Sequence, residues 1–169
     1  YFMKTIILRV MVLMVAILSL NSCSSDASED TSLSAKSQAA VSFDYSASEL
    51  STLKLINDYR VSKGLSELKQ INYVSVKSEE HDQYMISNNV VSHDGFVGRS
   101  EDIVKVVGAK NVGENIAYNY NTPEAAVNAW LKSTSHKENI EGNFTHFGIA
   151  IRENATTGKK YYTNIFVKI

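Results

Sequence analysis

The chain has 169 residues, with 17 basic side chains against 18 acidic ones and a formal net charge of −1. At roughly 100–200 residues per domain, this length indicates a single domain, and a hydrophobic share of 44% excludes wholesale disorder. The balanced charge lacks the basic surface that nucleic-acid binding needs, so we expect no nucleic-acid partner. The single Cys excludes an internal disulfide and a cysteine-rich zinc module.

The N-terminal part of the chain predicts a lipoprotein signal peptide over residues 1–22. Positive charge precedes an apolar run over residues 10–20, which is shorter than the ~20 residues of a membrane span and typical of a signal-peptide core. The run ends in Leu20-Asn21-Ser22-Cys23, which resembles the bacterial lipoprotein box. We therefore expect cleavage before Cys23 and acylation of its thiol. The alternative is a general secretory signal in which this Cys is incidental.

Residues 23–44 are predicted to form a tether between the lipidated Cys and a folded domain over residues 45–169. Ser, Ala and acidic residues dominate the tether, and it has no apolar periodicity. Acidic residues close behind the Cys resemble the surface-export signal of some bacterial lipoproteins, and a merely solvated tether is the alternative. We expect an extracytoplasmic protein that is lipid-anchored to a bacterial membrane, at the outer membrane or the cell surface.

Two long helices are predicted at the start of the folded domain. Either Ser46 or Ser48 can cap the first helix, and Gly64 ends it. The second helix is expected over residues 72–88, because apolar and small residues recur there at helical spacing. Its inward face is predicted to carry Val74, Ser78, His81 and Met85.

Shorter elements are predicted in the second half of the chain. A helix is expected near residues 101–107, with Ser100 as its cap, and another begins at Thr122 with Pro123 at its first position. The chain closes with a predicted β-hairpin. Its strands cover residues 147–152 and 161–169, and its turn covers residues 154–158.

Three polar residues from separate segments form a candidate functional set. His93 lies in the loop that leaves the second helix, His136 follows the Pro-capped helix, and Glu114 stands between Gly113 and Asn115 just before an apolar strand. Two His and one Glu can hold zinc or act as an acid–base set. Composition alone leaves a third interpretation open, in which all three are hydrogen-bonded structural groups.

The order of the motifs along the chain resembles the CAP superfamily. That family holds the cysteine-rich secretory proteins, antigen five and the pathogenesis-related class one proteins, together with bacterial SCP-like extracellular proteins. The resemblance covers nearly all of the predicted domain. It rests on six motifs: Leu55–Arg60, His81 with Met85, Ser92–His93, Gly113–Ile116, the series Trp130, Ser133, His136, Asn139 and Ile140, and Phe147–Ala150.

The resemblance implies an α+β fold, a three-layer α-β-α sandwich with a central antiparallel sheet. Members of the family place two His and two acidic residues in a cleft, where in several of them the two His bind zinc or another divalent ion. By motif position, the cleft here comprises His93, Glu114, Ser133 and His136, with His93 and His136 as the metal ligands and zinc as the first candidate ion. Ser133 stands where relatives carry the second carboxylate, so modest metal affinity is expected.

The remaining polar residues are predicted to be structural. Asn57 and Arg60 lie three residues apart on the first helix and are expected to tie it to neighbouring backbone. His81 is predicted to be a core histidine, and His146 matches no cleft position. A nucleophilic role for Ser133 is rejected because no Gly-x-Ser-x-Gly turn surrounds it.

Three functional hypotheses follow from the cleft and the anchor. The leading one is a monomeric, non-enzymatic module, tethered to the membrane, that binds a small ligand, a lipid or an envelope partner. The alternative is a metal-dependent, peptidase-like hydrolase that uses His93, Glu114 and His136, with Glu114 as general base and the metal activating water. A purely structural cell-envelope protein is the third. A catalytic zinc usually has three protein ligands, so the loss of the second carboxylate weakens the enzyme hypothesis.

Overall fold

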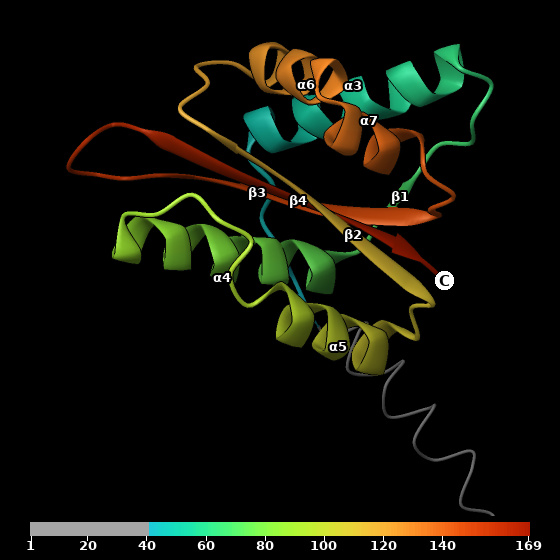
Figure 1. Ribbon diagram of the computed structural model, residues 1–169, viewed down its shortest axis with the longest axis horizontal. Helices are drawn as coiled ribbons and strands as arrows, with labels where there is room; N and C mark the ends of the chain where they lie inside the picture. The colour runs from blue at the N-terminus through green and yellow to red at the C-terminus, as the bar shows by residue number, and fades with distance from the viewer. Residues whose placement is uncertain (1–40) are drawn as a thin grey trace, which may run out of the picture. The chain divides into compact units, whose positions relative to one another are not determined.

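The computed structural model describes residues 41–169 (Figure 1). The predicted signal peptide, Cys23 and most of the predicted tether lie outside the described residues. Within residues 41–169, no helix is long and apolar enough to cross a membrane. The elements run in the order α3 (Ala47–Ser62), β1 (Lys69–Gln70), α4 (Asn72–Asn88), α5 (Phe96–Val107), β2 (Asn111–Tyr118), α6 (Pro123–Lys132), α7 (Thr134–Glu141), β3 (His146–Glu153) and β4 (Lys160–Lys168).

These elements form three layers around one sheet. Helices α4 and α5 cover one face of the sheet, and α3, α6 and α7 cover the other (Figure 1). The strand order is β1-β3-β4-β2, and β4 pairs antiparallel with both β2 and β3. The predicted α-β-α sandwich is therefore confirmed. One strand departs from the expected antiparallel pattern, because β1 pairs with β3 in parallel; with two residues it is too short to show an alternating pattern in the sequence.

The starts of the first two helices follow the local capping chemistry. The Ser46 hydroxyl accepts a hydrogen bond from the Glu49 N–H at 3.2 Å, and the Glu49 carboxylate accepts one from the Ser46 N–H at 2.7 Å. This reciprocal capping box settles the predicted choice between Ser46 and Ser48. Helix α4 covers residues 72–88, as predicted.

One helical prediction is wrong, and one further helix was not predicted. Helix α5 begins at Phe96 rather than near residue 101. Gly95 precedes it with a φ of 72°, which glycine adopts readily, and no side chain caps this start. Ser100 consequently lies inside the helix, where its hydroxyl donates to the Val97 carbonyl at 2.7 Å. Helix α7 was not predicted at all. Ile140 is its one buried residue, so its sequence carries no apolar stripe.

The Pro-capped helix and the hairpin are confirmed. The Thr122 hydroxyl accepts from the Ala125 N–H at 3.2 Å at the start of α6. In the hairpin turn, the Asn154 side chain accepts from the N–H groups of Thr156 and Thr157 at 2.9 and 3.0 Å, a turn that Asn favours. The turn closes at Gly158, whose φ is 67°.

Two hydrophobic clusters fill the spaces between the layers. Helix α4 crosses β3 so closely that a side chain at Gly148 would collide with the backbone of Ser75, which explains the glycine in the Phe147–Ala150 motif. The cluster under α3, α6 and α7 includes Ile56, Trp130, Phe147 and Phe166. The cluster under α4 and α5 includes Val74, Ile103, Val107 and Ile165.

Contacts of the folded domain extend back to Val41. The Asn72 side chain donates to the Val41 carbonyl at 3.1 Å. The rings of Phe43 and Tyr45 meet edge to face with centroids 4.7 Å apart, and the Arg152 guanidinium lies 5.4 Å from the Phe43 ring. Two residues near the end of the predicted tether, Val41 and Phe43, therefore contact the domain.

Candidate functional site

Glu114 lies on the edge strand β2, with its side chain on the α4–α5 side of the sheet. β2 pairs with β4 alone, and Glu114 stands opposite Ile165, a member of the cluster under α4 and α5. Directly opposed residues in a sheet share a face, and successive residues alternate. Asn115, opposite Asn164, consequently points toward α7. The neighbouring residues Glu114 and Asn115 therefore point to opposite faces of the sheet.

The Glu114 carboxylate is buried and fully paired. Arg99 on α5 donates from Nε to Oε2 at 2.8 Å and from Nη2 to Oε1 at 3.0 Å. His93 Nδ1 lies 2.8 Å from Oε1, while 1% of the Glu114 side chain is exposed. Two-point guanidinium pairing gives strong, directional hydrogen bonds and offsets the cost of burying the charge. Glu114 is thus held rigidly by α5 and by the loop before it.

The contact with Glu114 sets the orientation of the His93 ring. A carboxylate only accepts hydrogen bonds, so the proton of the neutral ring lies on Nδ1 and Nε2 is left as the free acceptor. The His93 side chain is 51% exposed, which leaves that second nitrogen open to the surface. The expected proximity of Glu114 to one of the two imidazoles is found, with His93.

The other side of β2 is held by the motif that contains His136. The Asn139 side chain donates to the Glu114 carbonyl at 3.2 Å and to Asn115 Oδ1 at 2.9 Å. Asn115 Nδ2 donates to the His136 carbonyl at 2.9 Å. A methyl group added at Gly113 would lie 2.8 Å from the Asn139 side-chain oxygen. The glycine of the Gly-Glu-Asn motif therefore makes room for α7 to dock on the edge strand.

His136 is half-buried and its imidazole has no hydrogen-bond partner among the described residues. Burial lowers the pKa of His136, and the nearby His93 lowers it further. The two imidazoles therefore interact electrostatically across the edge of β2. Ser133 lies at the junction of α6 and α7, where its hydroxyl is 3.4 Å from that of Ser135. The structure thus joins Glu114 to His93 and brings His136 close enough to His93 for the latter to lower its pKa. Among the described residues, the Ser133 hydroxyl bonds to Ser135 and to none of the other three.

Two residues that were not predicted as part of the site complete it. Arg99 is one, and its position one turn into α5 could have been predicted only with the correct start of that helix. His81 is the other: its Nε2 is 2.8 Å from the Ser92 carbonyl and 4.0 Å from Glu114 Oε1. His81 is buried, as expected of a core histidine, and it supports the loop that carries His93.

The structural roles predicted for the other polar residues are confirmed. Arg60 donates to the carbonyls of Ser66 and Ile140 at 2.9 and 2.6 Å, and Asn57 exchanges two hydrogen bonds with the Leu68 backbone. His146 bonds to Thr145 at the start of β3. Across residues 41–169, no group of three or more His, Cys, Asp or Glu side chains is placed to hold a metal ion.

The chain belongs to the CAP family, since the family model of the cysteine-rich secretory proteins matches residues 53–167. It is 34% identical over 125 residues to the membrane protein YlbC of Bacillus subtilis. This match covers 72% of this chain and 34% of YlbC. It is 35% identical over 115 residues to YkwD of the same organism, covering 66% of this chain and 45% of YkwD. The chain therefore spans less than half the length of both relatives.

Solved structures share the fold. An outer surface protein of Borrelia burgdorferi superposes with a TM-score of 0.67 at 19% identity, over 75% of this chain and 96% of that protein. An extracellular SCP-domain protein of Bacillus anthracis gives a TM-score of 0.63 at 26% identity, over 76% of this chain and 45% of that one. The family and the fold that the six motifs predicted are thus both confirmed.

Proposed function

We propose that the protein is a membrane-tethered, extracytoplasmic CAP-domain binding module whose cleft between His93 and His136 takes a divalent metal ion, with zinc as the first candidate. The observation that carries the proposal is the bond from His93 to the buried Glu114. The extracytoplasmic location is supported by the two solved relatives, one an outer surface protein and the other an extracellular protein. The tether rests on the predicted acylation of Cys23.

The pairing of His93 with Glu114 is the arrangement that prepares a histidine for a metal. A metal-binding imidazole almost always gives its other N–H to a carboxylate, a carbonyl or water, which orients the ring and raises its basicity. Burial lowers the pKa of His136 and so favours the neutral ring, the form that binds metal. A bound ion would supply a positive site for an acceptor group of a ligand. With two protein ligands, its affinity is expected to be modest.

The geometry favours this role for Glu114 over that of a general base. A base must present a free oxygen to the proton that it takes, and both oxygens of Glu114 are held by Arg99 and His93. The carboxylate that relatives carry at the position of Ser133 is a hydroxyl here. The hydrolase alternative therefore has no unoccupied carboxylate among the four cleft residues, and the binding module is the better-supported function.

Zinc titration of the full chain by calorimetry tests the metal proposal. His93→Ala and His136→Ala are each expected to weaken binding by about tenfold or more, because each removes one of two ligands. Ser133→Glu is expected to tighten binding if residue 133 reaches the same ion. Binding should weaken as the pH falls through ~6.5, where imidazoles gain protons.

His146→Ala is the matched control, since His146 lies on β3 and its side chain bonds, among the described residues, to its neighbour Thr145 alone. Zinc affinity that falls equally in this control, or that survives in the His93→Ala/His136→Ala double variant, would contradict the proposal. The tether has its own test, because mass spectrometry of the native N-terminus should show a lipidated Cys23 and an unmodified thiol would refute it.

A further inference from the structure

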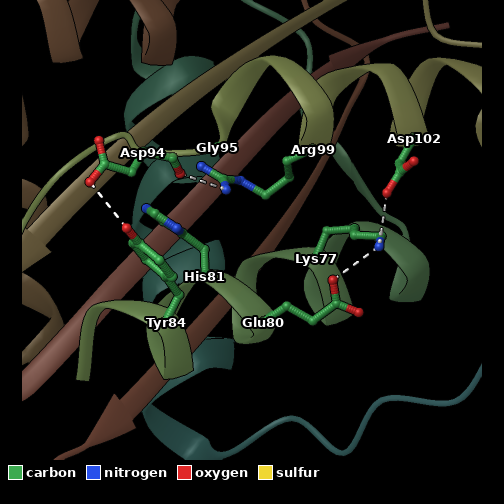
Figure 2. Close-up of a pocket in the computed structure, with 8 residues that line it drawn as sticks. All are labelled: Lys77, Glu80, His81, Tyr84, Asp94, Gly95, Arg99 and Asp102. Carbon is green, nitrogen blue, oxygen red and sulfur yellow. Dashed lines mark hydrogen bonds and ion pairs between the residues drawn. The ribbon is translucent and has the colours of Figure 1, made fainter. Parts of the chain in front are cut away.

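A cavity lies beside the His93–Glu114 pair, between α4 and the start of α5. It has a volume of about 290 Å³, and its lining side chains come from α4, the Asp94–Gly95 turn and α5 (Figure 2). Neither His93, Glu114, Ser133 nor His136 lines it. At about 30 Å³ per water molecule, the cavity holds about ten non-hydrogen atoms. This is the size of a monosaccharide or a small polyol.

The charged groups of the cavity already compensate one another. Lys77 is paired with Glu80 at 2.9 Å and with Asp102 at 3.2 Å, as the dashed lines in Figure 2 show. Arg99 is committed to Glu114 and to the Asp94 carbonyl, which accepts from Nη1 at 3.2 Å. No lining cation is left without an acidic partner or a carbonyl in this part of the structure, so the cavity does not present the free positive charge that an anion would need.

One buried atom in the cavity wall lacks a partner. The Ser92 carbonyl accepts from His81 Nε2, which places the proton of a neutral ring on that nitrogen and leaves Nδ1 as an acceptor. Nδ1 is buried and has no hydrogen-bond partner among the described residues, and the His81 side chain is 1% exposed. Burial and the charge of Arg99 lower the pKa of His81, which keeps the ring neutral. A buried acceptor without a donor is destabilising, so a donor from beyond the described residues would stabilise this atom.

The rest of the cavity wall also offers hydrogen-bond acceptors, together with an aromatic ring. The Asp94 carboxylate accepts from the Tyr84 hydroxyl at 3.2 Å and still has free lone pairs. The Tyr84 ring lies nearly parallel to that of His81, at 12° and 5.9 Å between centroids, and Tyr84 is 41% exposed. The wall therefore combines acceptors with a partly exposed aromatic ring.

We propose that this cavity binds an uncharged polyhydroxylated molecule of monosaccharide size, one hydroxyl of which donates to His81 Nδ1 while others bond to Asp94. A hydroxyl both donates and accepts, so it can satisfy the imidazole and the carboxylate without disturbing the paired charges. This binding uses none of the four cleft residues, although His81 also supports the loop that carries His93.

The test is NMR titration of the ¹⁵N-labelled full chain with methyl α-D-glucopyranoside, in the presence of EDTA to remove metal. The expected result is a saturable shift of the amide signals of Tyr84, Gly95 and Asp102, with a dissociation constant in the millimolar range. Inorganic phosphate and ethylamine, as the anionic and cationic probes, should shift these signals far less at equal concentration.

Two variants tie the binding to the cavity. Glu80→Trp places a large ring in the cavity and should weaken binding at least about tenfold, and the matched control Gln83→Trp, at an exposed position of the same helix, should leave it unchanged. His81→Phe keeps a planar ring but removes both the acceptor and the hydrogen bond to the Ser92 carbonyl, so it should weaken binding in protein that is confirmed to be folded. The proposal is overturned if methyl α-D-glucopyranoside causes no saturable shift, if phosphate or ethylamine binds more tightly, or if folded Glu80→Trp protein binds like the wild type.

Discussion

At the scale of single residues, the buried carboxylates Glu114 and Asp82 have opposite hydrogen-bonding environments. Glu114 receives a guanidinium and an imidazole. Asp82, fully buried on α4, receives one hydroxyl hydrogen bond, from Thr163 at 2.6 Å, and its second oxygen has no partner among the described residues. Burial raises the pKa of Asp82 well above its usual value of 3.8. The first carboxylate is therefore organised for a function, and the second costs stability.

Asp82→Asn should stabilise the protein at neutral pH. A native pKa above the unfolded one means that the native state keeps a proton that the unfolded chain releases, so stability falls as the pH rises above 3.8. Asn keeps the acceptor for Thr163 and removes this titration. Urea unfolding at pH 7 should show a gain of roughly 1–3 kcal/mol, which disappears below the usual carboxyl pKa. An equal gain at pH 3 and pH 7, or a loss at pH 7, would show that Asp82 does not bind the extra proton.

The sequence could predict some of these side chains and not others. His93 and Glu114 were found because each lies in a recognisable motif. Arg99 could not be found, because its reach to Glu114 depends on a helix start at Gly95 that rests on a positive φ rather than on a capping side chain. The partner of Asp82 lies 81 positions away in the chain, a distance that no local pattern bridges.

At the scale of elements, helix α7 contacts the sheet mainly through polar side chains rather than through an apolar face. Asn139 donates to the Glu114 carbonyl and to the Asn115 side chain, and Trp130 of α6 donates to the Ile116 carbonyl at 2.8 Å. These side chains satisfy backbone acceptors of the edge strand β2, which would otherwise be open to a foreign strand. Because the sequence of α7 is polar, the helix could not be predicted from an apolar stripe. The same polar residues hold the helix against β2.

Asn139→Ala should therefore loosen the site as well as the fold. It removes two hydrogen bonds and leaves a carbonyl of β2 without a donor, which should cost roughly 1–3 kcal/mol in urea unfolding. Asn143→Ala is the matched control, because Asn143 is exposed and bonds only to Lys168. Hydrogen exchange should show faster exchange in α7 and β2 of the first variant. Equal stability of the two variants would mean that Asn139 does not hold α7 to the sheet.

At the scale of the whole molecule, the sandwich was predictable because six motifs recur in the family order. The parallel strand β1 was not, since two residues carry no pattern. The contacts of Val41 with Asn72 and of Phe43 with Arg152 could not be predicted either, because these partners are distant in sequence.

The contacts of Val41 and Phe43 with the domain can be tested by truncation. Deleting residues 24–40 should leave thermal unfolding unchanged, whereas deleting residues 24–44 should lower the melting temperature by a few degrees, at about 3–5 °C per kcal/mol for a domain of this size. The loss comes from the hydrogen bond to Val41 and from the contact of Phe43 with Arg152. Equal melting temperatures for the two truncated chains would show that residues 41–44 do not stabilise the domain.

The most direct test of the central claim is a crystal structure of the zinc-soaked protein, with the metal located by anomalous scattering. The account predicts a single strong peak at the edge of β2, about 2 Å from His93 Nε2 and from a ring nitrogen of His136, with Glu114 still bonded to His93 Nδ1. Zinc bound elsewhere, or imidazoles more than about ten ångströms apart, would contradict the shared cleft, since zinc–nitrogen bonds are only ~2 Å long.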